Sequence, residues 1–340
     1  MESIFERSLK APSIACLGGG TGLSTMLRGL KRYTSDITAI VTVTDDGGGS
    51  GVLRDELGMP PPGDIRSCIL ALSNIEPTME KLMAYRFESG SLEGQSFGNL
   101  LLAAMNGISS SFDRAVARMG EVLAITGRVL PVTNEDVRLF AELEDGSVVF
   151  GESKIFEAKR ARNCRIRRVQ IVPSPVSALP ESIRAIEEAD LIILGPGSLY
   201  TSVIPNLLVG GIAKAIEKSH AQKLYIANIM TQPGETEGYT VSDHIKELFR
   251  HASGGLFDMC LVNSAPADPV LLARYESEGA LPITADLEEI ERLGVMVYSA
   301  PLVARRGALA RHDPDLLAHE IMKIYRAKAP TRLYDGRKVL

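Results

Sequence analysis

The residues Gly18-Gly19-Gly20-Thr21-Gly22 have the types that are needed to hold a phosphate group. Glycines let the backbone approach an anion closely, and the free N–H groups at the start of a following helix attract negative charge. Thr21 adds a hydroxyl donor. The turn is not a strict dinucleotide fingerprint, because Leu23 stands where the third glycine belongs, and it lacks the lysine of a P-loop. A phosphate site is the favoured interpretation, and a tight strand-to-helix turn without a ligand is the alternative.

A second cluster begins with Asp45 and Asp46 and continues with glycine and serine from 47 to 51. In Rossmann proteins an acid after the second strand binds the ribose hydroxyls. The glycines could form a further concave set of N–H groups for an anion. We therefore expect Asp45 and Asp46 to contact a ligand hydroxyl or a divalent cation. A plain turn with solvated acids remains the competing interpretation.

Further polar residues follow other predicted strands and bends. Asp64 comes directly after a rigid bend of three prolines and a glycine, and Asn99 opens an apolar helix, where it could cap the helix or touch a ligand. The loop at 195–198 is a second strand-to-helix glycine loop. Its candidate phosphate-binding residues are Gly195, Gly197 and Ser198, and Asn228 follows the next strand.

Short apolar runs alternate with helical patterns along most of the chain, which is typical of βαβ units and a parallel sheet. We predict an α/β fold of the Rossmann-like kind, because ligands bind at the carboxyl ends of strands in such sheets. The predicted strands are Ser13–Leu17, Asp36–Thr44, Ala189–Leu194, Lys223–Ile229 and Met259–Asn263. The predicted helices include Leu23–Arg32, Leu207–Lys218, Thr240–His251 and Asp315–Lys328.

One segment departs from this alternation. Asp145-Gly146 lies between two strand-like runs, which is the usual signal of a tight hairpin, and Arg165–Val172 is another strand pattern. We interpret residues from about 141 to 173 as an antiparallel excursion on the main sheet. The predicted organisation is an extension at 1–12, a single α/β domain at 13–314 that contains this insertion, and a C-terminal helix and tail at 315–340.

Composition excludes several classes of protein. The chain has 340 residues and a formal net charge of -5, which does not favour nucleic-acid binding. Its four cysteines have no metal-type spacing. The first ten residues lack the apolar region of a signal peptide, and no run reaches about 18 apolar residues, so we expect no membrane span and a cytoplasmic location.

Taken together, the motifs GGGTGLS, TDDGGGSG, SFGNLLLAAM, GPGSLYTSVIPNLL and NIMTQPGETEGYT resemble the YvcK-type gluconeogenesis factors of the CofD-like superfamily. The resemblance extends from about residue 13 to residue 312. It implies a Rossmann-like fold with a mainly parallel sheet, helices on both faces and a small antiparallel insertion.

The resemblance also implies a function. Members of this kind bind a UDP-sugar such as UDP-N-acetylglucosamine and act in cell shape and wall synthesis during growth on gluconeogenic carbon sources. They are not established as catalytic. The resemblance further implies a cell-wall-synthesis protein or a regulatory kinase as partner, and we expect a homodimer.

Site residues carry over by position. Gly18 to Thr21 would hold the diphosphate, and Asn99 and the 195–198 loop would close the site. Tyr275 and the Arg311-His312 pair fall where these proteins carry a tyrosine and an arginine-histidine pair. An arginine suits a diphosphate, and a tyrosine can stack on a uracil ring.

Two alternatives remain open. The superfamily's named enzyme, 2-phospho-L-lactate transferase, needs magnesium, and Asp45 is the candidate Mg²⁺ ligand if this chain is a similar phosphoryl-group transferase. An NAD(P)-dependent oxidoreductase would rest only on the strand–glycine–helix start, and the missing third glycine opposes it.

Overall fold

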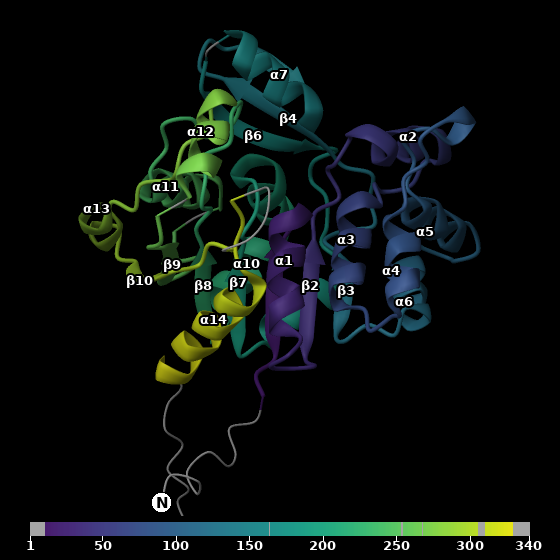
Figure 1. Ribbon diagram of the computed structural model, residues 1–340, viewed down its shortest axis with the longest axis horizontal. Helices are drawn as coiled ribbons and strands as arrows, with labels where there is room; N and C mark the ends of the chain where they lie inside the picture. The colour runs from purple at the N-terminus through teal and green to yellow at the C-terminus, as the bar shows by residue number, and fades with distance from the viewer. Residues whose placement is uncertain (1–10, 163, 253, 267, 305–309, 329–340) are drawn as a thin grey trace, which may run out of the picture.

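The computed structural model describes residues 11–162, 164–252, 254–266, 268–304 and 310–328. Its centre is a seven-stranded sheet in the order β10-β9-β8-β7-β1-β2-β3, in which every pair of neighbours is parallel (Figure 1). The strands are β1 Ile14–Gly18, β2 Ile37–Val41, β3 Arg128–Pro131, β7 Leu191–Leu194, β8 Gln222–Ile226, β9 Met259–Asn263 and β10 Met296–Ala300. The predicted Rossmann-like, mainly parallel α/β fold is confirmed.

Helices connect these strands and cover the sheet. They are α1 Gly20–Leu30, α2 Gly48–Leu57, α3 Gly63–Leu72, α4 Pro77–Ala84, α5 Phe97–Gly107, α6 Phe112–Val122, α8 Pro180–Glu187, α9 Ile204–Leu208, α10 Ile212–Lys218, α11 Val241–Ala252, α12 Pro269–Ser277, α13 Leu287–Arg292 and α14 Pro314–Lys328. A 3₁₀ turn at Gly90–Leu92 and a π-type turn at Leu199–Val203 complete the set.

The strand order reverses direction at β1. From β1 the chain moves through α1 to β2 on one side, and from β7 it moves through α9 and α10 to β8 on the other side. Since such crossovers are right-handed, α1 and α10 lie on opposite faces of the sheet. Every residue of β1, β2 and β7 is buried, which explains why these strands are continuous apolar runs rather than alternating ones.

The C-terminal helix α14 packs against α1, and the two lie side by side in front of the sheet (Figure 1). Leu317, Ile321 and Ile324 of α14 belong to the same hydrophobic core as the strands. Gly29 of α1 makes this approach close, because a Cβ atom there would lie 1.9 Å from the carbonyl oxygen of Pro314. Among the described residues, no helix combines the length and apolar character that crossing a membrane requires.

The antiparallel insertion is present, but it is not part of the main sheet. It forms its own three-stranded sheet in the order β5-β4-β6, made of β4 Arg138–Leu143, β5 Val148–Phe150 and β6 Ile166–Val172. It also contains a helix that we did not predict, α7 Glu152–Arg162. The insertion lies above the carboxyl ends of the main strands (Figure 1).

Another prediction needs correction. The continuous helix expected over Leu207–Lys218 is two helices, α9 and α10, separated at Gly210 and Gly211. Gly211 has φ +99°, a left-handed conformation that interrupts an α-helix.

Candidate functional site

The first glycine turn lies where β1 ends and α1 begins. Gly18 is the last residue of β1, and its carbonyl oxygen accepts hydrogen bonds from Thr42 N at 3.0 Å and Asn206 Nδ2 at 3.0 Å. Gly19 is the N-cap of α1 and makes no side-chain capping bond, and Gly20 has φ +63°. The first turn of α1 therefore offers backbone N–H groups to a ligand, as the sequence predicted for an anion site.

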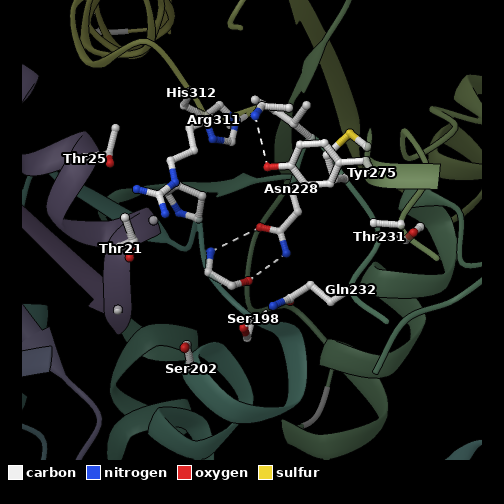
Figure 2. A pocket seen from close by; sticks show the side chains of 18 of the residues that line it. Thr21, Thr25, Ser198, Ser202, Asn228, Thr231, Gln232, Tyr275, Arg311 and His312 are labelled. Carbon is white, nitrogen blue, oxygen red and sulfur yellow. Dashed lines mark hydrogen bonds between the residues drawn. The ribbon is translucent and has the colours of Figure 1, made fainter. Parts of the chain in front are cut away.

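The second glycine loop follows β7, the neighbour of β1 in the sheet. Gly195 has φ +76°, and Asn228 fixes Gly197 from both sides, since Gly197 N donates to Asn228 Oδ1 at 3.2 Å and Asn228 Nδ2 donates to the Gly197 carbonyl at 2.8 Å (Figure 2). Gly22 packs directly on this loop: a Cβ atom there would lie 2.5 Å from the Pro196 carbonyl oxygen. The two loops thus meet at the point where the strand order reverses, the usual ligand position in this kind of fold.

A pocket of about 400 Å³ opens between these loops, and we call it the first pocket. Sequence-predicted residues in its wall are Gly19, Gly20, Thr21, Gly22, Gly197, Ser198, Asn228, Tyr275 and Arg311. Gly18 and Gly195 are not in the wall, since they sit at the strand ends beneath it. Thr25 and Gln232 were missed. Gln232 belongs to the polar loop after β8, and its Nε2 donates to Ser198 Oγ at 2.6 Å.

The far wall of the first pocket comes from the C-terminal part of the chain. Tyr275 of α12 is half-buried, and its hydroxyl accepts a hydrogen bond from Ala310 N at 3.1 Å. The side chain of the exposed Arg311 reaches toward the α1 side of the pocket, where Thr21 lies, and Tyr275 lies on the opposite side (Figure 2). A cation and an aromatic ring thus flank the helix N-terminus and the Asn228-held loop.

Asp45, Asp64 and Asn99 line a different cavity, which shares only Gly20 and Thr21 with the first. This second pocket has a volume of about 300 Å³. Its wall also contains Gly47, Gly48, Gly49, Ser50, Gly63, Arg66, Ser67 and Arg86. We expected one continuous site closed by Asn99 and the 195–198 loop. The structure instead has two pockets on either side of the first turn of α1.

The two aspartates of the second pocket are half-buried, and the desolvation of their carboxyl groups raises the pKa of both. The pKa of Asp64 rises to about 7, because the carboxyl is desolvated and faces the charge of Asp45, although the Gly20 backbone N–H stabilises its charged form. The pKa of Asp45 rises for the same main reason, desolvation, against hydrogen bonds from Gly47 and Ser50. These carboxyls take up protons more readily than ordinary acids.

Asp46 points away from both pockets. Its Oδ1 accepts a hydrogen bond from Ser153 N at 2.8 Å, at the start of α7 in the insertion. The neighbouring Glu152, which we did not predict, is directed inward, and burial together with Asp45 and Asp64 raises its pKa well above the usual value. The only sequence signal for Glu152 is that it follows Gly151, directly after the predicted hairpin.

Asn99 does not cap its helix. Ser96 is the N-cap of α5, and its Oγ accepts from Asn99 N at 3.2 Å. The side-chain Oδ1 of Asn99 is buried without a hydrogen-bond partner. Within the residues that the structure describes, no group of three or more His, Cys, Asp or Glu side chains has the geometry to hold a metal ion. The assignment of Asp45 as a Mg²⁺ ligand stays a prediction.

Comparisons with known proteins show which family this chain resembles. The model of a family described as 2-phospho-L-lactate transferase CofD matches residues 14–303. A gluconeogenesis factor of Bacillus subtilis is 51% identical over 308 residues, which is 90% of this chain and 96% of the relative. The gluconeogenesis factor of Halalkalibacterium halodurans is 46% identical over 316 residues, 93% of this chain and 97% of the relative.

A solved structure of similar sequence has the same fold. A crystal structure of a Bacillus halodurans protein, described as a member of the UPF0052 family, is 46% identical with a TM-score of 0.88. The match covers 93% of this chain and 100% of that one.

Proposed function

The chain belongs to the CofD family and to its branch of gluconeogenesis factors, and from this membership we propose that it is a regulatory protein that binds a nucleotide sugar. The ligand class is a UDP-sugar similar to UDP-N-acetylglucosamine. The role is in cell shape and wall synthesis under gluconeogenic growth, in the cytoplasm.

One observation carries the proposal: four kinds of group that suit a nucleotide diphosphate sugar converge on the first pocket. The N–H groups of Thr21 and Gly22, in the first turn of α1, suit the diphosphate, and so does the guanidinium of Arg311, which presents a fork of donors. The ring of Tyr275 suits a planar base, and Asn228 with its neighbouring hydroxyls suits a sugar. A volume of about 400 Å³ lies within the usual range for small-molecule sites.

Calorimetric titration with UDP-N-acetylglucosamine tests this proposal. We expect the wild-type chain to bind. The affinity of Arg311→Ala should be lower by roughly tenfold or more, because the diphosphate loses a charged bidentate partner. Tyr275→Ala should weaken binding in the same direction by removing the ring. Arg326→Ala, an exposed arginine near the end of α14, is the matched control and should bind as the wild type does. If the wild type gives no heat of binding and no thermal shift at millimolar ligand, the proposal is wrong.

The second pocket favours one alternative, a magnesium-dependent transferase of the CofD kind. The carboxylates of Asp45 and Asp64 and the unpartnered Oδ1 of Asn99 are oxygen ligands of the type that Mg²⁺ prefers, and they lie beside Gly20. Bound Mg²⁺ would neutralise charge on a transferring phosphoryl group. These residues would hold the ion and orient the group.

Turnover decides between the two functions. The chain is incubated with nucleotide-linked phosphoryl donors and Mg²⁺, and product is followed by mass spectrometry. A transferase should form product with the wild type and none with Asp45→Asn. If Asp45→Asn forms as much product as the wild type, Asp45 has no role in the reaction. If no donor gives product, the transferase function is rejected and the binding function is retained.

A further inference from the structure

Two arginines line the second pocket without a carboxylate partner. Arg66 of α3 and Arg86, which follows α4, both belong to its wall. Among the described residues, neither side chain forms an ion pair with an aspartate or a glutamate. Arg66 is half-buried and Arg86 is exposed. Cations that meet in a cavity without such partners favour an anion as the ligand.

Both side chains keep hydrogen-bond donors for a ligand. A guanidinium group has five N–H donors. Within the described chain, Arg66 Nη1 donates to the Met83 carbonyl and Nη2 donates to Ser67 Oγ, each at the long distance of 3.5 Å. The Nε of Arg66 is buried, so its donors for a ligand are those on the two Nη atoms. Arg86 donates from Nη1 to the Gly94 carbonyl, which leaves the rest of its fork available.

The charges in the second pocket also favour an anion. Desolvation lowers the pKa of Arg66, and the positive charge of Arg86 lowers it further, against the charge of Asp64. The two cations therefore destabilise each other, and an anion bound by both would relieve their repulsion. The carboxyl of Asp64 has a pKa of about 7 and carries only part of its charge at neutral pH. The two aspartates of the pocket thus do not fully offset its two arginines.

The rest of the wall indicates the kind of anion. Gly47 is the N-cap of α2 and makes no side-chain capping bond, so the first turn of this helix, with Gly48 and Gly49, brings N–H groups without intrahelical acceptors into the wall. Such groups, together with arginine forks, suit a phosphate. The carboxyl oxygens of Asp45 and Asp64 suit hydroxyl groups, which donate hydrogen bonds. A volume of about 300 Å³ is at the small end of the range for small-molecule sites.

We propose that the second pocket is a separate binding site for a small phosphorylated molecule that also carries hydroxyl groups. Its phosphate is held by Arg66 and Arg86, and its hydroxyl groups donate to the carboxyl oxygens of Asp45 and Asp64. This goes beyond the proposed function, because it gives the chain a second ligand besides the nucleotide sugar of the first pocket. Binding at this site requires no reaction.

Calorimetric titration of the full chain with glycerol 3-phosphate and with inorganic phosphate tests this site. The wild type should bind both, and glycerol 3-phosphate more tightly, because only its hydroxyl groups can bond the aspartates. Arg86→Ala should lower the affinity for both probes by about tenfold, since charge-assisted hydrogen bonds to the phosphate are lost, and Arg66→Gln should act in the same direction. Arg118→Ala is the matched control. Arg118 is an exposed arginine of α6 that also donates to a backbone carbonyl, that of Ile108, and it lies outside the second pocket, so this variant should bind as the wild type does.

A phosphate ester also suits the first pocket, so variants of the two pockets are compared. Arg86→Ala should weaken glycerol 3-phosphate more than Arg311→Ala does, and the order should be reversed for UDP-N-acetylglucosamine. If Arg311→Ala weakens glycerol 3-phosphate more, the phosphate binds in the first pocket and this inference is wrong. If Arg86→Ala does not fold, Arg66→Gln replaces it in the same comparison.

The remaining outcomes separate this inference from the proposed function. A wild type that binds neither probe at millimolar concentration overturns the second site, whatever its affinity for UDP-N-acetylglucosamine. Inorganic phosphate bound as tightly as glycerol 3-phosphate contradicts the role of the aspartates and therefore the ligand class. A wild type that binds glycerol 3-phosphate but not UDP-N-acetylglucosamine supports the second site and rejects the proposed function.

Discussion

Asp64 places a carboxyl group at the start of α1, where the helix also attracts anions. It accepts a hydrogen bond from the Gly20 backbone and lies against Gly19, with Oδ2 only 2.5 Å from where a Cβ of Gly19 would stand. Burial and the charge of Asp45 raise its pKa to about 7. At neutral pH the group is therefore partly protonated, and the charge near the glycine turn depends on pH.

The raised pKa predicts how stability changes with pH. Between the unfolded value of 3.8 and about 7, the folded chain holds more protons at Asp64 than the unfolded chain does, so its contribution to stability falls as pH rises. The free energy of unfolding of Asp64→Asn should fall less than that of the wild type between pH 4 and pH 7, by up to about 4 kcal/mol. Chemical denaturation at several pH values, without ligand, measures the difference.

Asp55→Asn provides a control of opposite sign. Asp55 is exposed and its pKa is lowered by a hydrogen bond and the charge of Arg138, so its stabilising effect is present at neutral pH and is lost in acid. Parallel pH profiles for the wild type and Asp64→Asn would mean that Asp64 has an ordinary pKa in the folded chain.

At the scale of elements, the insertion is tied to the main domain by the N-terminus of α7. Asp46 comes from the loop after β2 and caps this helix through Ser153 N, while the half-buried Glu152 is close enough to Asp45 and Asp64 for their charges to raise its pKa. Phe156 of α7 also contacts Gly234, because a Cβ at Gly234 would lie 2.5 Å from its ring. One helix therefore touches loops that follow β2 and β8, on the two sides of the site.

Removing the cap should loosen the insertion selectively. Asp46→Ala leaves the Ser153 N–H without its acceptor and should cost about 1 kcal/mol, the usual value for a lost N-cap. Amide hydrogen exchange should become faster in α7 and in its sheet, while the central strands β1 and β7 keep their protection.

Asp313→Ala is the matched cap deletion elsewhere. Asp313 Oδ1 accepts from Asp315 N at 2.9 Å and Leu316 N at 3.0 Å at the start of α14, so this variant should speed exchange in α14 and not in α7. Unchanged exchange in α7 of Asp46→Ala would show that the Asp46 bond does not hold the insertion.

At the scale of the whole molecule, the C-terminal helix α14 packs on α1, the connecting helix of the chain's first βαβ unit. Gly29→Ala tests this packing. Alanine normally stabilises a helix interior relative to glycine, but here its Cβ would meet the Pro314 carbonyl at 1.9 Å and Ala318 Cβ at 2.8 Å. We expect a loss of about 1–3 kcal/mol from overpacking, measured by thermal or urea unfolding.

Gly107→Ala serves as the comparison for this variant. Gly107 ends α5, and apart from its chain neighbours and the helix's own backbone no atom lies within 4 Å of the position of its missing Cβ, so alanine should be neutral or slightly stabilising there. If both variants unfold alike, α14 does not pack on α1 as described.

Much of this architecture could be predicted from sequence because buried parallel strands are unbroken apolar runs. Met259–Asn263 was predicted with its observed bounds, and the start of each glycine loop followed from its strand. The strand β3 was missed because it begins with an arginine and ends with a proline, as only an edge strand can. The helix α7 was missed because charged residues dominate it and few apolar ones mark a buried face.

The site was harder to predict than the fold. Sequence order showed that glycine loops and acids follow strands, but not on which side of α1 each would lie. Asp45 and Asp46 are adjacent in sequence, yet one lines the second pocket and the other caps α7. That separation is set by tertiary contacts with the insertion, and no local pattern encodes them.

Gly20 and Thr21 form part of the wall of both pockets. An occupant of either pocket therefore changes the electric field that the other occupant meets at the first turn of α1. Thermodynamic reciprocity requires that two ligands held in this way alter each other's affinity by the same factor. Two anions would oppose each other across the turn, whereas an anion on one side and a cation on the other would cooperate, so the first turn of α1 can serve as the coupling element between two chemical signals.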